Sequence, residues 1–132
     1  MRKSILIADD NAFVRTVLYE FFERQPDFHV CALAEDGREA IEKACRLKPD
    51  LIVLDLSMPV MNGLEAARIL IKIMPAVPLI MYSAIGDTAS KQIAKSIGSC
   101  EVISKSDRVS VLIDKARDLV DKAHGLDERK AA

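Results

Sequence analysis

Five polar residues directly follow short apolar runs of the sequence and could do chemistry together. Asp9 and Asp10 come after the first run, and Asp55 follows the third. Ser83 follows the fourth run, and Lys105 lies just beyond the fifth. Ligands of open parallel sheets bind beyond the carboxyl ends of the strands. If the runs are strands of one such sheet, three carboxylates, a hydroxyl and an ammonium group converge at one edge.

This set of groups suits the transfer of a phosphoryl group. Three neighbouring carboxylates repel one another and are hard to ionise unaided. A divalent cation relieves that repulsion, and Mg²⁺ prefers oxygen ligands while keeping room for phosphate oxygens. A carboxylate can attack phosphorus to give an aspartyl phosphate, and a lysine can meet the remaining phosphoryl charge. Because positioning and charge neutralisation are nearly all that this reaction requires, the pattern predicts a Mg²⁺-dependent phosphoryl acceptor.

Each of these residues also has a plainer structural interpretation. Asp9 and Asp10 could cap the helix that follows them, and Asp55 could cap a turn. Ser83 could begin a turn, and Lys105 could be an ordinary surface lysine. Taken alone, each of these roles is the commoner one. Complementary groups at four separate strand ends nevertheless favour the functional interpretation.

Alternating apolar patterns predict the elements that would position these residues. Short apolar runs predict five strands, and apolar residues at helical spacing predict five helices. The strands are expected at 4–8, 28–33, 51–54, 77–82 and 101–103, and the helices at 13–22, 40–47, 63–74, 88–96 and 109–120. This order indicates an α/β fold, a doubly wound five-stranded parallel sheet flanked by five helices.

Size and composition limit the class of protein. The 132 residues suit one domain, expected at 1–122, with 123–132 as a polar, frayed tail or linker. A net charge of −1 without a basic stripe argues against direct binding of nucleic acid. No apolar stretch approaches the roughly 18 residues that span a membrane. Three widely spaced cysteines, each expected to be a buried thiol, argue against a disulfide framework and fit a reducing cytoplasm.

Four segments of the sequence resemble the response-regulator receiver family of two-component signalling. They are the run from Ile5 to Asn11, the run from Asp50 to Gly63, the pair Ser83–Ala84, and Lys105. Their order and spacing together are specific, and the resemblance covers about residues 3–120. It implies the CheY-like, flavodoxin-like arrangement of the sheet, with strand order 2-1-3-4-5.

The resemblance implies a role for each acidic residue of the site. Asp55 would be the phosphoacceptor and a metal ligand. Asp10 would bind Mg²⁺ directly, and Asp9 would bind the ion through water or support the site. The backbone carbonyl of Ser57 would supply a further metal oxygen, and Mn²⁺ could take the place of Mg²⁺.

Three further positions would contact the phosphoryl group, according to the resemblance. Lys105 would contact its oxygens, the Ser83 hydroxyl would turn toward them after phosphorylation, and the backbone amide of Ala84 would donate to them. Two positions depart from the family pattern. Val102 stands where the family often has an aromatic switch residue, so no ring is present there to swing toward the site. Ser106 stands where a proline often follows the lysine, which leaves the isomer of that peptide bond open.

The implied function is signalling rather than turnover of a metabolite. A sensor histidine kinase or a phosphotransfer protein would donate the phosphoryl group, and the surface around the last strand and its flanking helices would change. The downstream target is unknown, and a homodimer stays open. The sequence also leaves open a pseudo-receiver that acts only as a docking module, and the N-terminal fragment of a DNA-binding response regulator.

Two functions from other classes fit the sequence less well. A small Mg²⁺-dependent phosphatase or phosphotransferase would usually need a second aspartate at the position of Ser57. A nucleotide- or flavin-binding module would need a glycine-rich phosphate loop after the first strand. The sequence has Asp9-Asp10-Asn11 there, and its carboxylates would repel phosphate in the absence of a metal.

Overall fold

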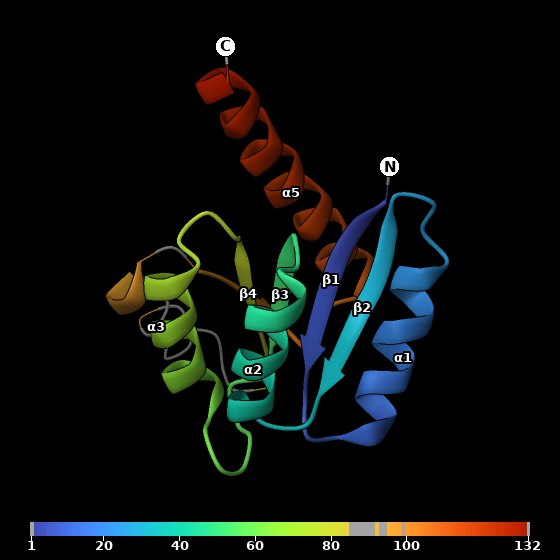
Figure 1. Ribbon diagram of the computed structural model, residues 1–132. Coiled ribbons are helices and arrows are strands. Elements are labelled where there is room, and N and C mark those ends of the chain that lie inside the picture. Colours follow the sequence, from blue (N-terminus) through green and yellow to red (C-terminus); the bar gives the residue numbers. More distant parts are fainter. Residues whose placement is uncertain (1, 85–91, 93–94, 99, 132) are drawn as a thin grey trace.

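Five parallel strands form the centre of the protein, in the order β2-β1-β3-β4-β5. The computed structural model describes residues 2–84, 92, 95–98 and 100–131 (Figure 1). The strands are β1 (Lys3–Ala8), β2 (Phe28–Ala34), β3 (Leu51–Leu54), β4 (Leu79–Ser83) and β5 (Cys100–Ser104). Every neighbouring pair in the sheet is parallel. The predicted fold class and strand order are therefore confirmed.

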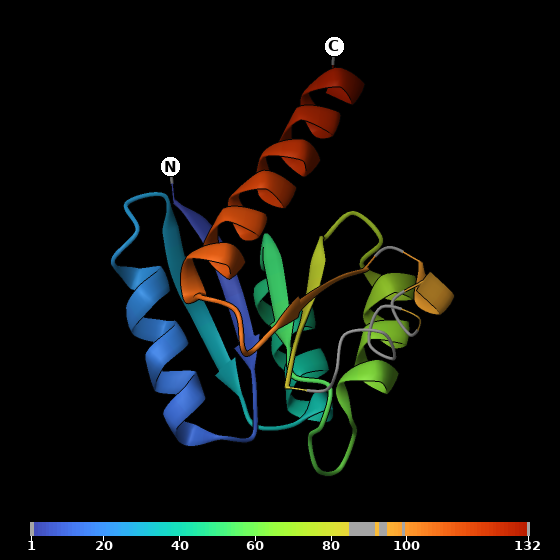
Figure 2. The ribbon, with the colours of Figure 1, turned by 180° about the vertical axis from the view of Figure 1, so that it is seen from behind.

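Helices cover both faces of the sheet (Figures 1 and 2). They are α1 (Ala12–Glu23), α2 (Gly37–Leu47), α3 (Gly63–Ile73) and α5 (Val109–Ala131). α1 and α5 lie on one face, and α2 and α3 lie on the other. The helix predicted over 88–96 falls largely outside the described residues, which include only 92, 95 and 96 of that range.

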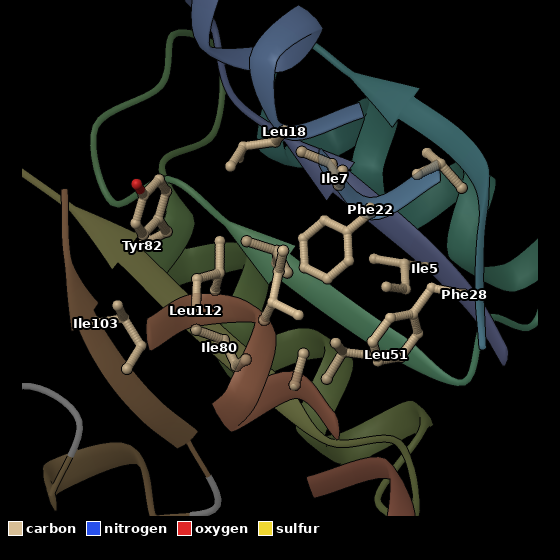
Figure 3. Close-up of a cluster of buried hydrophobic side chains, with 14 of the residues drawn as sticks. Ile5, Ile7, Leu18, Phe22, Phe28, Leu51, Ile80, Tyr82, Ile103 and Leu112 are labelled. Carbon is tan, nitrogen blue, oxygen red and sulfur yellow. The ribbon is translucent and has the colours of Figure 1, made fainter. Parts of the chain in front are cut away.

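The core consists of two apolar layers separated by the sheet. On one face, Leu18 and Phe22 of α1 and Leu112 of α5 pack against the strands (Figure 3). On the other face, small residues such as Ala40 of α2 and Ala66 of α3 bring the helices close to the sheet. All four residues of β3 are buried, as expected for a central strand without polar alternation. Two-sided burial of β3 fixes the position of the residue that follows it.

The caps of two helices are asparagines rather than the aspartates of the candidate site. The Asn11 side chain accepts a hydrogen bond from the third backbone N–H of α1, and Asn62 does the same for α3. These bonds satisfy amide groups that have no partner within the helix. The interpretation of Asp9 and Asp10 as caps of the helix that follows them is therefore wrong, whereas the Asp55 side chain does accept a hydrogen bond within its turn, from the Ser57 N–H.

The C-terminal segment differs from the prediction. The tail expected to be frayed over 123–132 is helical as far as Ala131, because α5 continues without a break. In Figures 1 and 2 this helix projects well beyond the edge of the sheet. None of the helices in the described part of the chain is long and apolar enough to cross a lipid bilayer.

Two smaller expectations are also resolved. Cys45 is exposed, which corrects its predicted burial, whereas Cys31 and Cys100 are half-buried. None of the three cysteines forms a disulfide. The peptide bond that joins Lys105 to Ser106 is not cis, since the described backbone contains no cis peptide bond.

Candidate functional site

The candidate residues meet at the carboxyl edge of the sheet. Asp9 and Asp10 follow β1, Asp55 follows β3, Ser83 ends β4, and Lys105 follows β5. Carboxylate oxygens of the three aspartates all lie within 4.8 Å of one another. The strand-end logic of the sequence therefore correctly predicts that these groups converge.

Lys105 joins two of the carboxylates. Its Nζ lies 2.8 Å from Asp9 Oδ2 and 3.3 Å from Asp55 Oδ1. Its backbone N–H donates to the carbonyl oxygen of Ser83 at 2.8 Å, which ties the loop after β5 to the end of β4. The side chain of Lys105 is only 20% exposed, so its charge is shielded little by water. The ammonium group is therefore placed beside the carboxylate that is the candidate nucleophile.

Asp9 is enclosed and has hydrogen bonds to both of its carboxylate oxygens. The side chain is buried, and Oδ1 accepts from the Asn11 N–H at 2.9 Å while Oδ2 faces Lys105. Its backbone carbonyl accepts from Arg15 Nη1 at 2.6 Å, and Arg15 also pairs with Glu35. This arrangement favours a supporting role for Asp9 over direct ligation. Asp10, by contrast, is exposed and open to an incoming ligand.

The loop after Asp55 needs glycine at position 63. A Cβ at Gly63 would overlap the backbone carbonyl of Asp55, so a larger residue would push the loop after Asp55 out of place. The Gly63 N–H donates to the carbonyl of Leu56 at 2.9 Å. Within this loop, the Ser57 N–H donates to Asp55 Oδ1 at 3.4 Å. The start of α3 thus holds the loop closely against the end of β3.

Burial and charge make Asp55 unusually reluctant to ionise. Its side chain is 6% exposed. Burial, and then the nearby Asp9 carboxylate, raise the pKa of Asp55 from its usual 3.8 to about 6, although Lys105 opposes this shift. Burial alone would lower the pKa of Lys105, but its bonds to Asp9 and Asp55 outweigh burial and raise it. Three carboxylates facing one ammonium group leave the site short of positive charge.

The donor set fits a hard divalent cation. All the candidate ligands are oxygen atoms, and the oxygens of Asp9, Asp10 and Asp55 are close enough to share one ion. An open depression of about 600 Å³ lies beside them and is lined by Asp10, Ser57, Met58, Pro59, Asn62, Leu56 and Leu64. A small ligand can therefore approach the acidic groups from solvent.

The remaining predicted positions surround this cluster. Ser83 is buried at the end of β4, and Ala84 next to it is exposed. Val102 of β5 is half-buried and packs on the α2–α3 face of the sheet. Because residue 102 is a valine, the α2–α3 face has no aromatic ring at this position.

Two residues near the site escaped the sequence interpretation. Arg15 holds the Asp9 carbonyl from α1, and the ring centroid of Tyr82 lies 6.0 Å from Lys105 Nζ. A signal existed for each of them. Arg15 is the one basic residue within α1, and Tyr82 is the one residue with a polar end in the apolar run before Ser83.

The chain is similar to receiver domains of known proteins. The family model of the response regulator receiver domain matches residues 5–117. The chemotaxis protein CheY of Thermotoga maritima is 37% identical over 114 residues, which cover 86% of this chain and 94% of that protein. The crystal structure of the response regulator domain of Thermotoga maritima CheB has a TM-score of 0.84 at 34% identity and covers 92% of this chain and 98% of that one.

Longer relatives share only this region. A protein-glutamate methylesterase/protein-glutamine glutaminase of Pyrococcus abyssi is 38% identical over 117 residues. That match covers 86% of this chain but 32% of the relative, so the chain spans about a third of its length.

Proposed function

The chain belongs to the response regulator receiver domain family, and from this premise we propose that it accepts a phosphoryl group on Asp55. The observation that carries the proposal is the position of the Asp55 carboxylate. It lies buried at the end of the central strand, within the acidic cluster and 3.3 Å from Lys105 Nζ. Asp9 shares the cluster and the ammonium group, but its other carboxylate oxygen accepts from the Asn11 N–H at 2.9 Å, which favours a supporting role for it.

In the proposed reaction, an Asp55 carboxylate oxygen forms a bond to phosphorus. The bond from phosphorus to the donor breaks at the same time, and its electron pair stays on the phosphohistidine nitrogen of a kinase, or on the acetate oxygen of acetyl phosphate. Lys105 donates hydrogen bonds to the phosphoryl oxygens and offsets their charge. The Ser83 hydroxyl and the Ala84 amide serve as further donors once the aspartyl phosphate has formed.

The residues that would hold Mg²⁺ are Asp10, Asp55 and the backbone carbonyl of Ser57, with Asp9 in support. When bound, Mg²⁺ supplies a divalent charge that neutralises the acidic cluster and the equatorial phosphoryl oxygens. Asp9 contributes by holding Lys105 at 2.8 Å, so the lysine is already aimed at the acceptor. Mn²⁺ would suit the same oxygen ligands.

This proposal assigns the chain a signalling role. A sensor histidine kinase or a phosphotransfer protein is the proposed donor, and the cytoplasm is the proposed location. The methylesterase and glutaminase activities named for the longer relatives are not proposed for this chain, which spans about a third of such a relative. A pseudo-receiver is less well supported, because the complete acidic set and the lysine are assembled.

The proposal is tested by labelling the protein with acetyl phosphate. Intact-mass measurement should show one phosphoryl increment in the presence of Mg²⁺ and none when EDTA is added. Asp55→Asn should abolish the increment, because an amide is not a competent nucleophile here. Asp50→Asn is the matched control, since Asp50 lies at the opposite end of β3, where it accepts from the Ser4 N–H at 2.8 Å.

Three outcomes would contradict the proposal. Equal labelling in EDTA would remove the metal from the reaction. Labelling that persists in Asp55→Asn would move the acceptor to another residue. An unlabelled wild-type protein, folded and supplied with Mg²⁺, would support a docking module instead.

A further inference from the structure

Tyr82 is a buried aromatic residue next to the reacting groups. It precedes Ser83 in β4, its side chain is 5% exposed, and it pairs with Ile103 in the sheet register. Figure 3 shows its ring at one end of the apolar cluster between the sheet and helices α1 and α5. The ring is therefore fixed both by the sheet and by the packing around it.

The face of this ring is a third partner for the Lys105 ammonium. The ring centroid lies 6.0 Å from Nζ, which is within the range in which an aromatic ring attracts a cation. The other two partners of the ammonium are the carboxylates of Asp9 and Asp55. Burial, mainly, raises the pKa of Tyr82, so the phenol is neutral at physiological pH.

Lys105 lies beside a small cavity as well as beside its charged partners. A small cavity of about 120 Å³ lies beside it and is lined by Tyr82 and Lys105 themselves, with Phe13, Val14, Val17, Leu18 and Val109. Lysine also carries its charge on a flexible four-carbon stem. Asp9 and Asp55 hold the ammonium through their charges, and the Tyr82 ring adds a neutral contact that does not depend on those charges.

We propose that Tyr82 is a positioning residue, whose ring holds the Lys105 ammonium in line with the Asp55 carboxylate during phosphoryl transfer. This inference rests on the proposed function. When the phosphoryl group arrives, Lys105 has to turn from the carboxylate oxygens toward the phosphoryl oxygens. The ring does not change its charge or its place in β4, so it can hold the ammonium before and after that turn.

The competing explanation is that Tyr82 is simply part of the core. Both explanations predict that loss of the ring destabilises the fold, so stability alone does not separate them. Only a positioning role predicts that the ring affects phosphorylation through Lys105. Mg²⁺ affinity also has to be measured separately. Lys105 is not among the proposed Mg²⁺ ligands, so a positioning role for Tyr82 predicts no change in that affinity.

The test compares rates of labelling by acetyl phosphate at saturating Mg²⁺ for Tyr82→Phe, Tyr82→Leu and Phe28→Leu. Phe28 is the matched control, because it is a buried aromatic residue at the far end of the same cluster (Figure 3). We expect Tyr82→Phe to stay near the wild-type rate, since it keeps the ring. Tyr82→Leu should be slower by roughly two- to fivefold, as expected for loss of one cation–π contact. Phe28→Leu should lose stability but not rate.

Two further measurements separate positioning from general damage. The Mg²⁺ dissociation constant, measured by calorimetry, should be unchanged in Tyr82→Leu. In a Lys105→Met background, Tyr82→Leu should cause no additional slowing, since the partner of the ring is gone. If Tyr82→Leu does not fold, Tyr82→Met is the second ring-free variant. Its Mg²⁺ dissociation constant and its labelling rate with and without Lys105 are measured in the same way.

The inference would be overturned if a folded ring-free variant labels at the wild-type rate, or if the slowing persists without Lys105. It would equally be overturned if Tyr82→Leu weakens Mg²⁺ binding as much as it slows labelling. These failures differ from failure of the proposed function, in which the wild-type protein itself acquires no label.

Discussion

At the scale of single residues, the protonation of Asp55 controls the site. Its pKa lies near 6, mainly because the carboxyl group is buried and secondly because Asp9 is close. A metal ligand has to be deprotonated, so protons and Mg²⁺ compete for Asp55 below that pH. The Asp55 carboxylate is therefore deprotonated and able to bind the metal at neutral pH, but it becomes protonated in mild acid.

The first prediction concerns the affinity for Mg²⁺. We expect the dissociation constant to be nearly constant from pH 7 to 8, and to rise by up to about tenfold for each pH unit below 6. Calorimetric titration from pH 5 to 8 measures it. Asp55→Asn should bind more weakly and should lack the step near pH 6. An affinity for Mg²⁺ that is independent of pH between 5 and 7 would contradict this role of Asp55.

The second prediction concerns the stability of the metal-free protein. The folded protein has the higher pKa for Asp55, so ionisation of this group costs the folded state free energy. This destabilisation is absent below the usual pKa of 3.8 and fully present above about 6. We therefore expect Asp55→Asn to raise the free energy of unfolding at pH 7 by about 1–3 kcal/mol.

Urea unfolding in EDTA at pH 7 and at pH 4 measures this effect. The gain from Asp55→Asn should shrink at pH 4, where the aspartate of the folded protein is protonated. Asp50→Asn should give no gain at either pH, because Asp50 caps the Ser4 N–H rather than facing another carboxylate. An Asp55→Asn variant that is less stable than the wild type at pH 7 would show that ionisation of Asp55 does not destabilise the folded protein.

The sequence predicts the members of the site better than their pairings. Three carboxylates, a hydroxyl and a lysine at strand ends were sufficient to predict a common edge. The pairing of Lys105 with Asp9 as well as Asp55 was not predictable, because side-chain rotamers and distances of a few ångströms decide it. Tyr82 differs from the rest of its apolar run by its polar end, but the sequence does not indicate that its ring lies beside the lysine.

At the scale of the elements, the start of α3 determines where the acceptor loop lies. Gly63 begins this helix directly against the backbone of Asp55. We expect Gly63→Ala to lower the free energy of unfolding by about 3 kcal/mol, because the new Cβ would overlap the backbone carbonyl of Asp55. Labelling of the acceptor should fall as well, since the loop that carries it is displaced.

Gly98→Ala provides the matched control for this prediction. Gly98 has a φ of +98°, and a Cβ built there meets nothing within 4 Å. This variant should cost only the backbone strain of a positive φ, about 1–2 kcal/mol, and should leave labelling intact. Urea unfolding and mass labelling measure both variants. If Gly63→Ala loses no more stability and no more labelling than Gly98→Ala, the close packing of Gly63 against Asp55 does not position the loop.

Most elements follow from the periodicity of the sequence, and the errors have physical reasons. β4 begins at Leu79 rather than at 77, because Pro78 has no N–H to donate and contributes only its carbonyl, to Ile52 N–H. The helical extension of α5 was missed because the prediction ended the helix where its apolar stripe ends. Intrinsic helix propensity can carry a helix beyond its buried face, and most residues from 126 to 131 are good helix formers.

At the scale of the whole molecule, the sheet connects the acidic edge to the outer surfaces. The sequence alone predicted a doubly wound sheet, and the family resemblance was needed for the strand order, since periodicity does not reveal which strands are neighbours. Ser83 ends β4 and Lys105 follows the adjacent strand β5, and a backbone hydrogen bond joins the two residues. A displacement of one of them therefore displaces the other. We therefore expect the response to phosphorylation to spread through β4, β5 and the start of α5.

Hydrogen exchange followed by mass spectrometry measures that response. Labelled wild-type protein should change its exchange in β4, β5 and the start of α5, and little in α2. Ser83→Ala should acquire label within about fivefold of the wild-type rate, because one neutral hydrogen-bond donor contributes about 1 kcal/mol. Its exchange response should be much smaller. A Ser83→Ala variant that labels and responds like the wild type would remove the hydroxyl from the switch.

The central claim is that one particular carboxylate, on Asp55, receives the phosphoryl group. Borohydride reduces an acyl phosphate to an alcohol, so labelled protein can be reduced, digested and mapped by tandem mass spectrometry. We predict that homoserine replaces aspartate at position 55, only in samples that contained both Mg²⁺ and acetyl phosphate. Homoserine at position 9 or 10, or a stable phosphate on a serine, threonine or histidine with position 55 unmodified, would contradict the account.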